Sequence, residues 1–315
     1  MRVGIVTPAY NVAPYIGDAI RSVLSQTHQA WTMTIVDDGS TDATTAVVAG
    51  FDDPRLCLIR QRNAGVSAAR NRGVTATYAE AVLFLDADDW LSPDALALLT
   101  AALSVDSGAI AAVGPYSRVP DSPPNGSVLG RRARSRIVRP ASGDLLEALL
   151  VRNLFANGGH LLIRRSVLDA AGPFRSGLRY GEDWEYWTRL ARSGTFTAVE
   201  TPTPLLFVRE RHGSAYLGMA TRPESFIPCM DAIFNVPALR VRFGPAVLAR
   251  MRRSAEAEND WIVGRELIRH GSPAEGRRFL RRSVRGAPGL RRLALLAAGS
   301  LPWLRVGPFR RYPAL

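Results

Sequence analysis

The sequence predicts an α/β protein with a Rossmann-like, mostly parallel sheet flanked by helices and a helical C-terminal extension. Three observations support this. Short apolar runs of strand length alternate with amphipathic segments of helical periodicity, which is typical of βαβ units. Several of these runs end in acidic or turn-forming residues, and ligands of such sheets bind at the carboxyl ends of strands. Beyond Glu210 no further strand-like run occurs, and the chain is rich in arginine.

The elements can be placed in order from these patterns. Strands are expected at 2–7, 32–36, 56–60, 81–85, 109–113, 160–163, 196–199 and 205–208. Between them, helices are expected near 14–25, up to 48, and at 68–77, 95–103, 142–151, from 166, and up to 193. The stretch 116–140 has neither period and predicts a long surface loop. Near the end, 254–270 and 273–285 predict a helical hairpin. We therefore expect a catalytic domain at 1–212 and a basic helical region at 213–315.

The charge of the chain is unevenly distributed. The net charge is +12, all 40 basic residues are arginine, and 213–315 together with Arg211 carries 19 arginines against 7 acidic residues. The two cysteines, Cys57 and Cys229, supply neither a disulfide framework nor a thiolate metal site, which favours a reducing compartment. No leader and no apolar stretch of about 20 residues is evident. We expect a cytoplasmic protein, peripheral at the inner face of the membrane.

The most informative stretch is an apolar run at 81–85 followed by Asp86, Asp88 and Asp89. The run predicts a strand buried on both faces of a parallel sheet. Carboxylates packed so closely repel one another unless a cation lies between them. A hard divalent ion, Mn²⁺ or Mg²⁺, already holding a diphosphate is the natural partner. Helix capping would require only one of the three carboxylates.

Six segments together resemble the family 2 glycosyltransferases of the GT-A fold. They are, in order, 3–11 (VGIVTPAYN), 22–27 (SVLSQT), 35–42 (IVDDGSTD), 63–71 with its NAG and ARN, 86–89 (DADD) and 181–184 (GEDW). The resemblance covers about residues 1–210. It implies a metal-dependent, inverting transfer of a sugar from a nucleoside-diphosphate sugar, UDP-sugar favoured, to a saccharide or lipid-linked acceptor. Such a reaction would serve cell-surface polysaccharide or glycoconjugate synthesis.

The resemblance also implies roles for individual residues. Donor-binding roles fall on Pro8, Ala9, Tyr10, Asp38, Arg70 and Asp86. Among them, the first three would line the nucleobase pocket, Asp38 would accept the base's imide N–H, and Asp86 would meet the ribose. Arg70 could pair with phosphate or be a solvated surface residue. One of Asp37 and Asp38 could serve only as a helix cap. Asp88 would bind the metal, and Asp89 would be structural.

The resemblance places the general base at Asp183, in the first turn of a helix. A carboxylate there can take the proton of the acceptor hydroxyl, although Glu182 and Asp183 could instead satisfy the helix N-terminus. His212 is a candidate second metal ligand, but its spacing to Ser214 is one residue shorter than the family's pattern. We expect His160 to be a hydrogen-bonded strand histidine, not a ligand.

Two other functions are open to this sequence. A nucleotidyltransferase of related fold usually has a glycine-rich, basic loop after the first strand, where this chain has 7–11 (TPAYN). A nucleic-acid-binding protein could use the arginines of the C-terminal third, but they lack interleaved aromatic residues. No lysine is present for a P-loop, and no GxGxxG follows the first strand. We therefore expect no nucleic-acid partner. The apolar stretch 293–304, with arginines around it, suits a helix at an anionic membrane surface, or a helix packed back on the catalytic domain with its arginines solvated.

Overall fold

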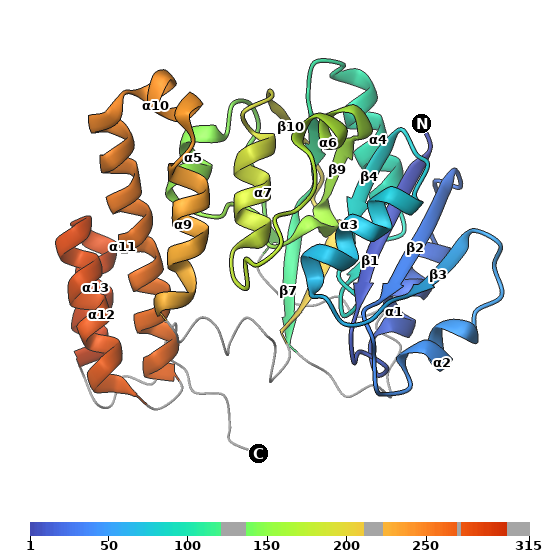
Figure 1. Cartoon of the computed structure of the whole chain (residues 1–315), viewed down its shortest axis with the longest axis horizontal. Coiled ribbons are helices and arrows are strands. Elements are labelled where there is room, and N and C mark those ends of the chain that lie inside the picture. Colours follow the sequence, from blue (N-terminus) through green and yellow to red (C-terminus); the bar gives the residue numbers. More distant parts are fainter. Residues whose placement is uncertain (121–136, 211–222, 270–271, 301–315) are drawn as a thin grey trace. The chain divides into compact units, whose positions relative to one another are not determined.

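A computed structural model describes residues 1–120, 137–210, 223–269 and 272–300 (Figure 1). The described residues fall into two compact units. Unit 1 holds those within Met1–Leu146, Leu154–Gly177 and Tyr186–His212. Unit 2 holds those within Glu147–Asn153, Leu178–Glu185 and Gly213–Leu315. That residues 213–315 fold as a domain of their own stays a prediction.

Unit 1 is organised around a seven-stranded sheet in the order β10-β6-β9-β4-β1-β2-β3. Its strands are β1 (Val3–Ala9), β2 (Trp31–Asp37), β3 (Leu56–Arg60), β4 (Ala81–Phe84), β6 (Ala111–Val113), β9 (Leu161–Arg164) and β10 (Phe196–Ala198). The pairs β3-β2-β1-β4 and β6-β10 are parallel, whereas β9 runs antiparallel to both β4 and β6. The expected α/β fold with a mostly parallel sheet is confirmed.

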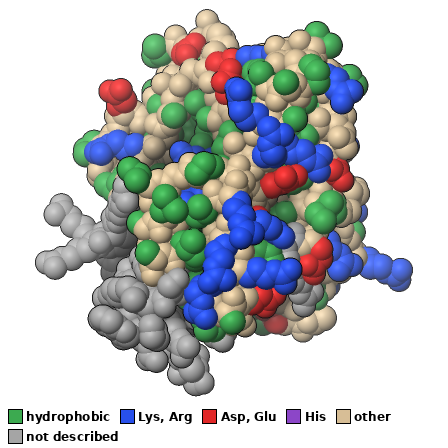
Figure 2. Space-filling view, turned by 90° about the vertical axis from the view of Figure 1, so that its left-hand side faces the viewer, with side chains coloured by type: hydrophobic (Ala, Val, Ile, Leu, Met, Phe, Trp, Pro, Cys, Tyr) green, Lys and Arg blue, Asp and Glu red, His purple; other side chains and the backbone are tan. Residues whose placement is uncertain are grey.

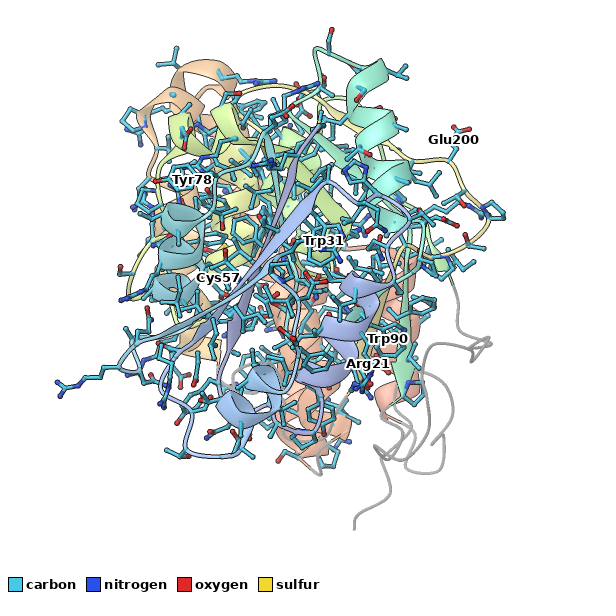
Figure 3. All side chains as sticks on the ribbon, turned by 90° about the vertical axis from the view of Figure 1, so that its right-hand side faces the viewer. Arg21, Trp31, Cys57, Tyr78, Trp90 and Glu200 are labelled. Atoms are coloured by element: carbon cyan, nitrogen blue, oxygen red, sulfur yellow. The ribbon has the colours of Figure 1, made fainter. Side chains whose placement is uncertain are left out.

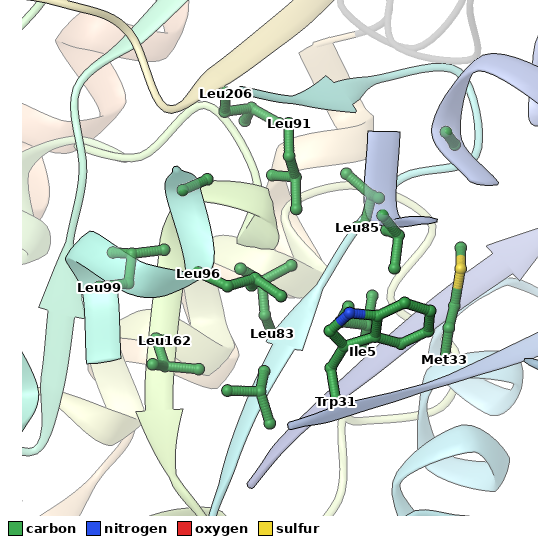
Figure 4. Close-up of a cluster of buried hydrophobic side chains, with 14 of the residues drawn as sticks. Ile5, Trp31, Met33, Leu83, Leu85, Leu91, Leu96, Leu99, Leu162 and Leu206 are labelled. Atoms are coloured by element: carbon green, nitrogen blue, oxygen red, sulfur yellow. The ribbon is translucent and has the colours of Figure 1, made fainter. Parts of the chain in front are cut away.

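One face of this sheet carries the main core, because side chains alternate along each strand. Ile5 of β1, Met33 of β2 and Leu83 at β4 are fully buried on this face. Figure 4 shows them beside Leu96 and Leu99 of α4 (Ala95–Val105). The helices α1 (Ile16–Leu24) and α2 (Thr44–Ala49) contribute Ile16, Ile20 and Val48 to the same cluster.

The opposite face is covered by helices α3 (Val66–Ala76), α6 (Arg165–Ala171) and the C-terminal half of α7 (Glu182–Leu190). Phe84 of β4 points to this side and meets Phe174 and Trp187 edge-on or tilted, with ring centroids 5.2 and 6.3 Å away. Gly73 lets α3 approach β1 closely, since a Cβ there would overlap the Val6 side chain. The buried strand β4 therefore has apolar cover on both faces, as the run at 81–85 predicts.

A second, four-stranded sheet has the order β5-β11-β7-β8. Its strands are β5 (Trp90–Leu91), β7 (Tyr116–Pro120), β8 (Ile137–Val138) and β11 (Leu206–Glu210). The expectation of a loop throughout 116–140 is wrong at both ends of that stretch, where β7 and β8 pair antiparallel. Both strands are short, and β7 pairs in parallel with the distant strand β11, which a local pattern does not reveal.

Unit 2 is helical and includes all but the first residue of α5 (Leu146–Val151). Its other helices are α9 (Ile227–Phe234), α10 (Pro237–Phe243), α11 (Pro245–Arg269), α12 (Pro273–Gly286) and α13 (Leu290–Ser300). The expected hairpin is present as α11 and α12, with α11 beginning nine residues earlier than its apolar period indicates. Gly264 and Gly276 let the two helix backbones touch, since a Cβ on Gly264 would lie 2.8 Å from the Gly276 carbonyl oxygen. No helix in the described ranges is long and apolar enough to cross a membrane.

Candidate active site

The carboxyl ends of β1, β2 and β4 lie side by side in unit 1. In the parallel register Ala9 is opposite Asp37, and Val6 is opposite Phe84. The chain segments that follow these strands therefore leave the sheet at one edge, with Tyr10, Asp38 and Asp86 as early residues. Pro8 is half-buried, Ala9 is buried and Tyr10 is 49% exposed. The fold thus brings the sequence-predicted donor residues of three strands to the same edge.

The segment after β1 is fastened to the segment after β2. Asn11 has a left-handed backbone, with φ of 51°. Its side-chain oxygen accepts hydrogen bonds from the backbone N–H of Thr41 at 2.8 Å and of Asp42 at 3.3 Å. In return, the backbone N–H of Asn11 donates to Ser40 Oγ at 3.0 Å. These bonds explain why the Asn11 and 39–42 (GSTD) parts of the motifs occur together.

Asp37 and Asp38 have different partners. Asp37 accepts from the Ser40 backbone N–H at 2.9 Å and from Thr45 Oγ1 at 2.5 Å. Burial alone would raise the pKa of Asp37, but the hydrogen bonds from Ser40 and Thr45 and the charge of Arg60 outweigh it, so the pKa is lowered. Asp37 is therefore the member of the pair that organises the turn into α2.

Asp38 shapes the loop that starts α3. Its two oxygens accept from Gln61 Nε2 at 2.7 Å and from the backbone N–H groups of Ala64 and Gly65 at 2.9 and 2.8 Å. Gly65 has φ of 90°, a conformation that favours glycine. A carboxylate offers about four acceptor positions, so three are used within the described part of the chain. The fourth position of Asp38 could accept the N–H of a nucleobase. This role of Asp38 stays a prediction.

Arg70 of α3 is buried and turns towards Asp86. Its Nη2 lies 3.1 Å from Asp86 Oδ1, and its guanidinium carbon lies 5.4 Å from the centroid of the Phe174 ring. The neighbouring Asn71 exchanges two hydrogen bonds with the backbone of Phe174, at 2.9 and 2.7 Å. Arg70 is thus no solvated surface residue. In this structure it orients Asp86, and any contact with phosphate would be made from that position.

Asp89 faces inward and holds the acidic turn in place. Its two oxygens accept from Arg209 backbone N–H at 2.8 Å and from Asn157 Nδ2 at 2.5 Å. Burial raises the pKa of Asp89 well above its usual value, and repulsion from Asp88 and Asp86 adds to the rise. Both of its oxygens are engaged by buried donors, so Asp86 and Asp88 are the two carboxylates of the cluster that remain at the sheet edge.

Arg209 of β11 completes this arrangement and was missed as a site residue at the level of sequence. Its Nε donates to the Asp88 carbonyl oxygen at 3.0 Å, and its Nη2 pairs with Asp18 at 2.8 Å. The guanidinium carbon also lies 4.9 Å from the centroid of Trp90, a residue marked in Figure 3. An arginine that is 7% exposed is unusual, but its acidic partners are 120 and more positions away in the chain.

Asp183, the predicted base, lies in the part of α7 that belongs to unit 2. One carboxylate oxygen accepts from the Trp184 backbone N–H at 2.7 Å, and the other accepts from Asn153 Nδ2 at 3.1 Å. The preceding Gly181 has φ of 73° and its carbonyl oxygen accepts from the buried Cys229 thiol at 3.2 Å. Burial raises the pKa of Cys229, and Asp183 and its acidic neighbours raise it further. Asp183 is therefore held in a defined orientation at a helix start.

Two of the four histidines, His160 and His212, were weighed as metal ligands. His160 is buried, Nδ1 lies 2.8 Å from the Gly114 carbonyl oxygen, and Nε2 accepts from the Ala156 backbone N–H at 3.3 Å. Because a carbonyl only accepts, the proton sits on Nδ1. Burial lowers the pKa of His160 to about 4. His160 is hydrogen-bonded as expected, but its placement in a strand is wrong, because it ends a 3₁₀ turn (Gly158–His160) directly before β9. His212, the candidate metal ligand, lies outside the described residues.

Fold and site together define an α/β protein with an acidic cluster at the carboxyl edge of a mostly parallel sheet. Comparison with known proteins specifies the class. Residues 4–172 match the model of Glycosyl transferase family 2, and the chain belongs to this family.

Individual relatives agree with this assignment. The chain is 39% identical over 97 residues to the putative teichuronic acid biosynthesis glycosyltransferase TuaG of Bacillus subtilis, covering 30% of this chain and 38% of that one. TarS 1–349 of S. aureus in complex with UDP-GlcNAc has a similar fold, with a TM-score of 0.61, 18% identity, and 95% and 84% coverage of the two chains.

A second structure with a similar fold is the mannosyltransferase PcManGT of Pyrobaculum calidifontis in complex with GDP-Man and Mn²⁺. Its TM-score is 0.57 at 22% identity, with 98% of this chain and 82% of that chain covered. The chain spans less than half the length of the curated relatives it matches, from 17% to 38% for three of them.

We expect His160 to make stability depend on pH. The unfolded chain binds this proton near pH 6.5 and the folded chain only near pH 4. The unfolded state therefore holds more protons between these values, and the free energy of unfolding falls as the pH is lowered. Relative to pH 7, His160 lowers the free energy of unfolding by about 3 kcal/mol at pH 4, at about 1.4 kcal/mol per pKa unit. Urea unfolding of the wild type and of His160→Gln at pH 7 and pH 4 measures it. Equal losses in both proteins would contradict this assignment.

Proposed function

We propose that this chain is an inverting glycosyltransferase that transfers a sugar from a nucleoside-diphosphate sugar, UDP-sugar favoured, to a saccharide or lipid-linked acceptor. The observation that carries the proposal is the edge of the seven-stranded sheet. There Tyr10, Asp38, Asp86 and Asp88 follow three neighbouring strands on a family 2 fold. Support for the donor class comes from the similar folds that hold UDP-GlcNAc and GDP-Man.

The donor would lie along this edge in a defined direction. Pro8, Ala9 and Tyr10 would contact the base, with Asp38 accepting its imide N–H. Asp86, oriented by Arg70 at 3.1 Å, would meet the ribose. The diphosphate would then reach the acidic turn that carries Asp86 and Asp88.

The carboxylates fit a divalent ion of the Mn²⁺ or Mg²⁺ kind. Asp88, with Asp86 beside it, would hold the ion, and His212 stays a proposed further ligand. Within the described ranges no three His, Cys, Asp or Glu side chains gather closely enough to form a protein cage. Mg²⁺ commonly binds proteins through one or two carboxylates together with the substrate's phosphates. When bound, such an ion neutralises charge that develops on the leaving diphosphate.

Asp183 would act on the acceptor. The acceptor hydroxyl oxygen attacks the anomeric carbon from the face opposite the nucleoside diphosphate, the bond to the diphosphate oxygen breaks, and the configuration inverts. Asp183 takes the hydroxyl proton. Its two hydrogen bonds, from Trp184 N–H and Asn153 Nδ2, would keep its carboxylate pointing in one direction. The helix N-terminus around it favours a negative charge.

The biological setting we propose is the synthesis of a cell-surface polysaccharide or glycoconjugate. A relative at 39% identity bears a name from teichuronic acid biosynthesis. A cytoplasmic enzyme at the inner face of the membrane would meet both a soluble nucleotide-sugar and a lipid-linked acceptor. No nucleic-acid partner is part of this proposal.

Asp88→Asn should abolish cation-dependent nucleotide binding, because the change removes the charge that holds the ion and little volume. Calorimetric titration of UDP with and without Mn²⁺ measures this. The matched control is Asp52→Asn, the same change at an exposed position before β3, which should bind as the wild type does. UDP affinity that is unchanged by Asp88→Asn would show that Asp88 does not hold the ion.

Asp183→Asn should leave nucleotide and cation binding nearly unchanged and lower turnover by about 10²–10⁴-fold, the range for a lost general base. Turnover is measured as UDP release from UDP-sugars in the presence of acceptor. The comparison variant is Glu182→Gln, one residue earlier in the same helical turn, which should keep most activity. If Asp183→Asn retains near-normal turnover, or if donor binding fails with it, the base lies elsewhere, and Glu182 is the next candidate.

A further inference from the structure

Helix α12 in unit 2 has one buried face and one arginine face. Gly276, Phe279, Leu280 and Ser283 are buried, at helical spacing, and pack towards α11. Arg278, Arg281 and Arg285 follow the spacing i, i+3, i+7 and are all exposed. Residues at that spacing share one side of a helix. Figure 2, which looks onto the side where α12 and α13 lie in Figure 1, shows arginine side chains gathered there beside hydrophobic ones.

Within the described ranges no ion pair joins these three arginines to a carboxylate, and the acidic residues of α11 pair with other arginines. Asp231 and Glu256 both pair with Arg252, at 2.7 and 3.0 Å. The remaining ion pairs of the helices are Arg265–Glu266, Arg282–Asp260 and Arg292–Glu258. The carboxylates of α11 are thus engaged in these ion pairs, and α12 itself carries five arginines against one acidic residue, Glu275.

Helix α13 packs against α12 and presents apolar side chains outward. Leu296 contacts the cluster formed by Trp261 and Leu280. On its other side, Leu290 is 87% exposed and Leu293 is 48% exposed. Ala294 and Ala297 are exposed as well and continue the spacing i, i+3, i+4, i+7 from Leu290. An exposed apolar stripe of this kind on a helix marks an interaction surface.

We propose that the arginine face of α12 and the apolar stripe of α13 together dock on the surface of a membrane that contains anionic lipids. The guanidinium groups would pair with lipid phosphates. Leu290 and Leu293 would enter the boundary between headgroups and acyl chains, as in helices that lie in the membrane interface. A nucleic acid would match the arginines but would leave exposed leucines without a partner. The inference rests on the proposed function only in that such a surface would carry a lipid-linked acceptor.

The test uses the full-length chain and sedimentation with liposomes. Vesicles of phosphatidylcholine with about one third phosphatidylglycerol should bind the protein at low salt, and pure phosphatidylcholine vesicles should bind it far more weakly. An arginine near an anionic surface contributes about five-fold in partitioning. The triple variant Arg278→Gln, Arg281→Gln, Arg285→Gln should therefore lose about 100-fold. Leu290→Ser with Leu293→Ser should also weaken binding, and the loss should persist as salt is raised.

The matched control removes three exposed arginines from unit 1, as Arg2→Gln, Arg72→Gln, Arg192→Gln, and should bind as the wild type does. All variants are compared by thermal unfolding and by UDP titration, which report folding and donor binding separately. Three results would overturn the proposal: no binding of the wild type to anionic vesicles, equal loss in the unit 1 control, or displacement by duplex DNA with no effect of the leucine changes. Vesicle binding without UDP binding would contradict the proposed function alone.

Discussion

The acidic edge of this protein depends on one buried carboxylate, that of Asp89. Removing a carboxylate from water is costly unless its oxygens receive hydrogen bonds. Asp89 receives one from Asn157, which precedes β9, and one from the backbone of Arg209 on β11. The chain after β4 is thereby joined to two segments that are 68 and 120 residues further along. Because Asp89 is turned inward, Asp86 and Asp88 are left at the sheet edge.

A second set of contacts fixes the other side of the same edge. Asp38 holds the start of α3 through the backbone of Ala64 and Gly65, and α3 in turn carries Arg70 to Asp86. Asp38 and Asp86, at the two ends of the candidate site, are therefore connected through a single helix. A change at the Asn63–Gly65 loop would be transmitted to Asp86 without any direct contact, which ties the 63–65 (NAG) and 86–89 (DADD) motifs together physically.

Much of unit 1 could be predicted because its signals are local. The apolar run at 81–85 shows that a strand is buried on both faces, and the alternation of strands and helices gives the sheet. The hairpin of α11 and α12 follows from the period of its apolar residues. What the sequence could not show depends on distant partners: the second sheet, in which short strands pair across some 90 residues, and the antiparallel insertion of β9 between β4 and β6.

The same distinction applies to the site. The acidic cluster, the proposed donor residues and Asp183 are visible as motifs. The sequence left open which of Asp37 and Asp38 caps a helix, because capping and ligand binding use the same residue type. Arg70 was expected to face phosphate or solvent, whereas its burial against Phe174 and its bond to Asp86 arise only in the folded chain. Arg209 and Asn157 were missed because single buried polar residues carry no periodic signal.

The most direct test of this account compares Asp89 with Asp88 by chemical unfolding. Asn in place of Asp89 can accept at only one of its two terminal atoms, so one of the donors Asn157 and Arg209 N–H would lose its partner. The free energy of unfolding should fall by about 1–3 kcal/mol for Asp89→Asn. For Asp88→Asn it should change by less than about 1 kcal/mol. Equal losses for the two variants, or a larger loss for Asp88→Asn, would contradict the separation between a structural and a ligand-binding carboxylate.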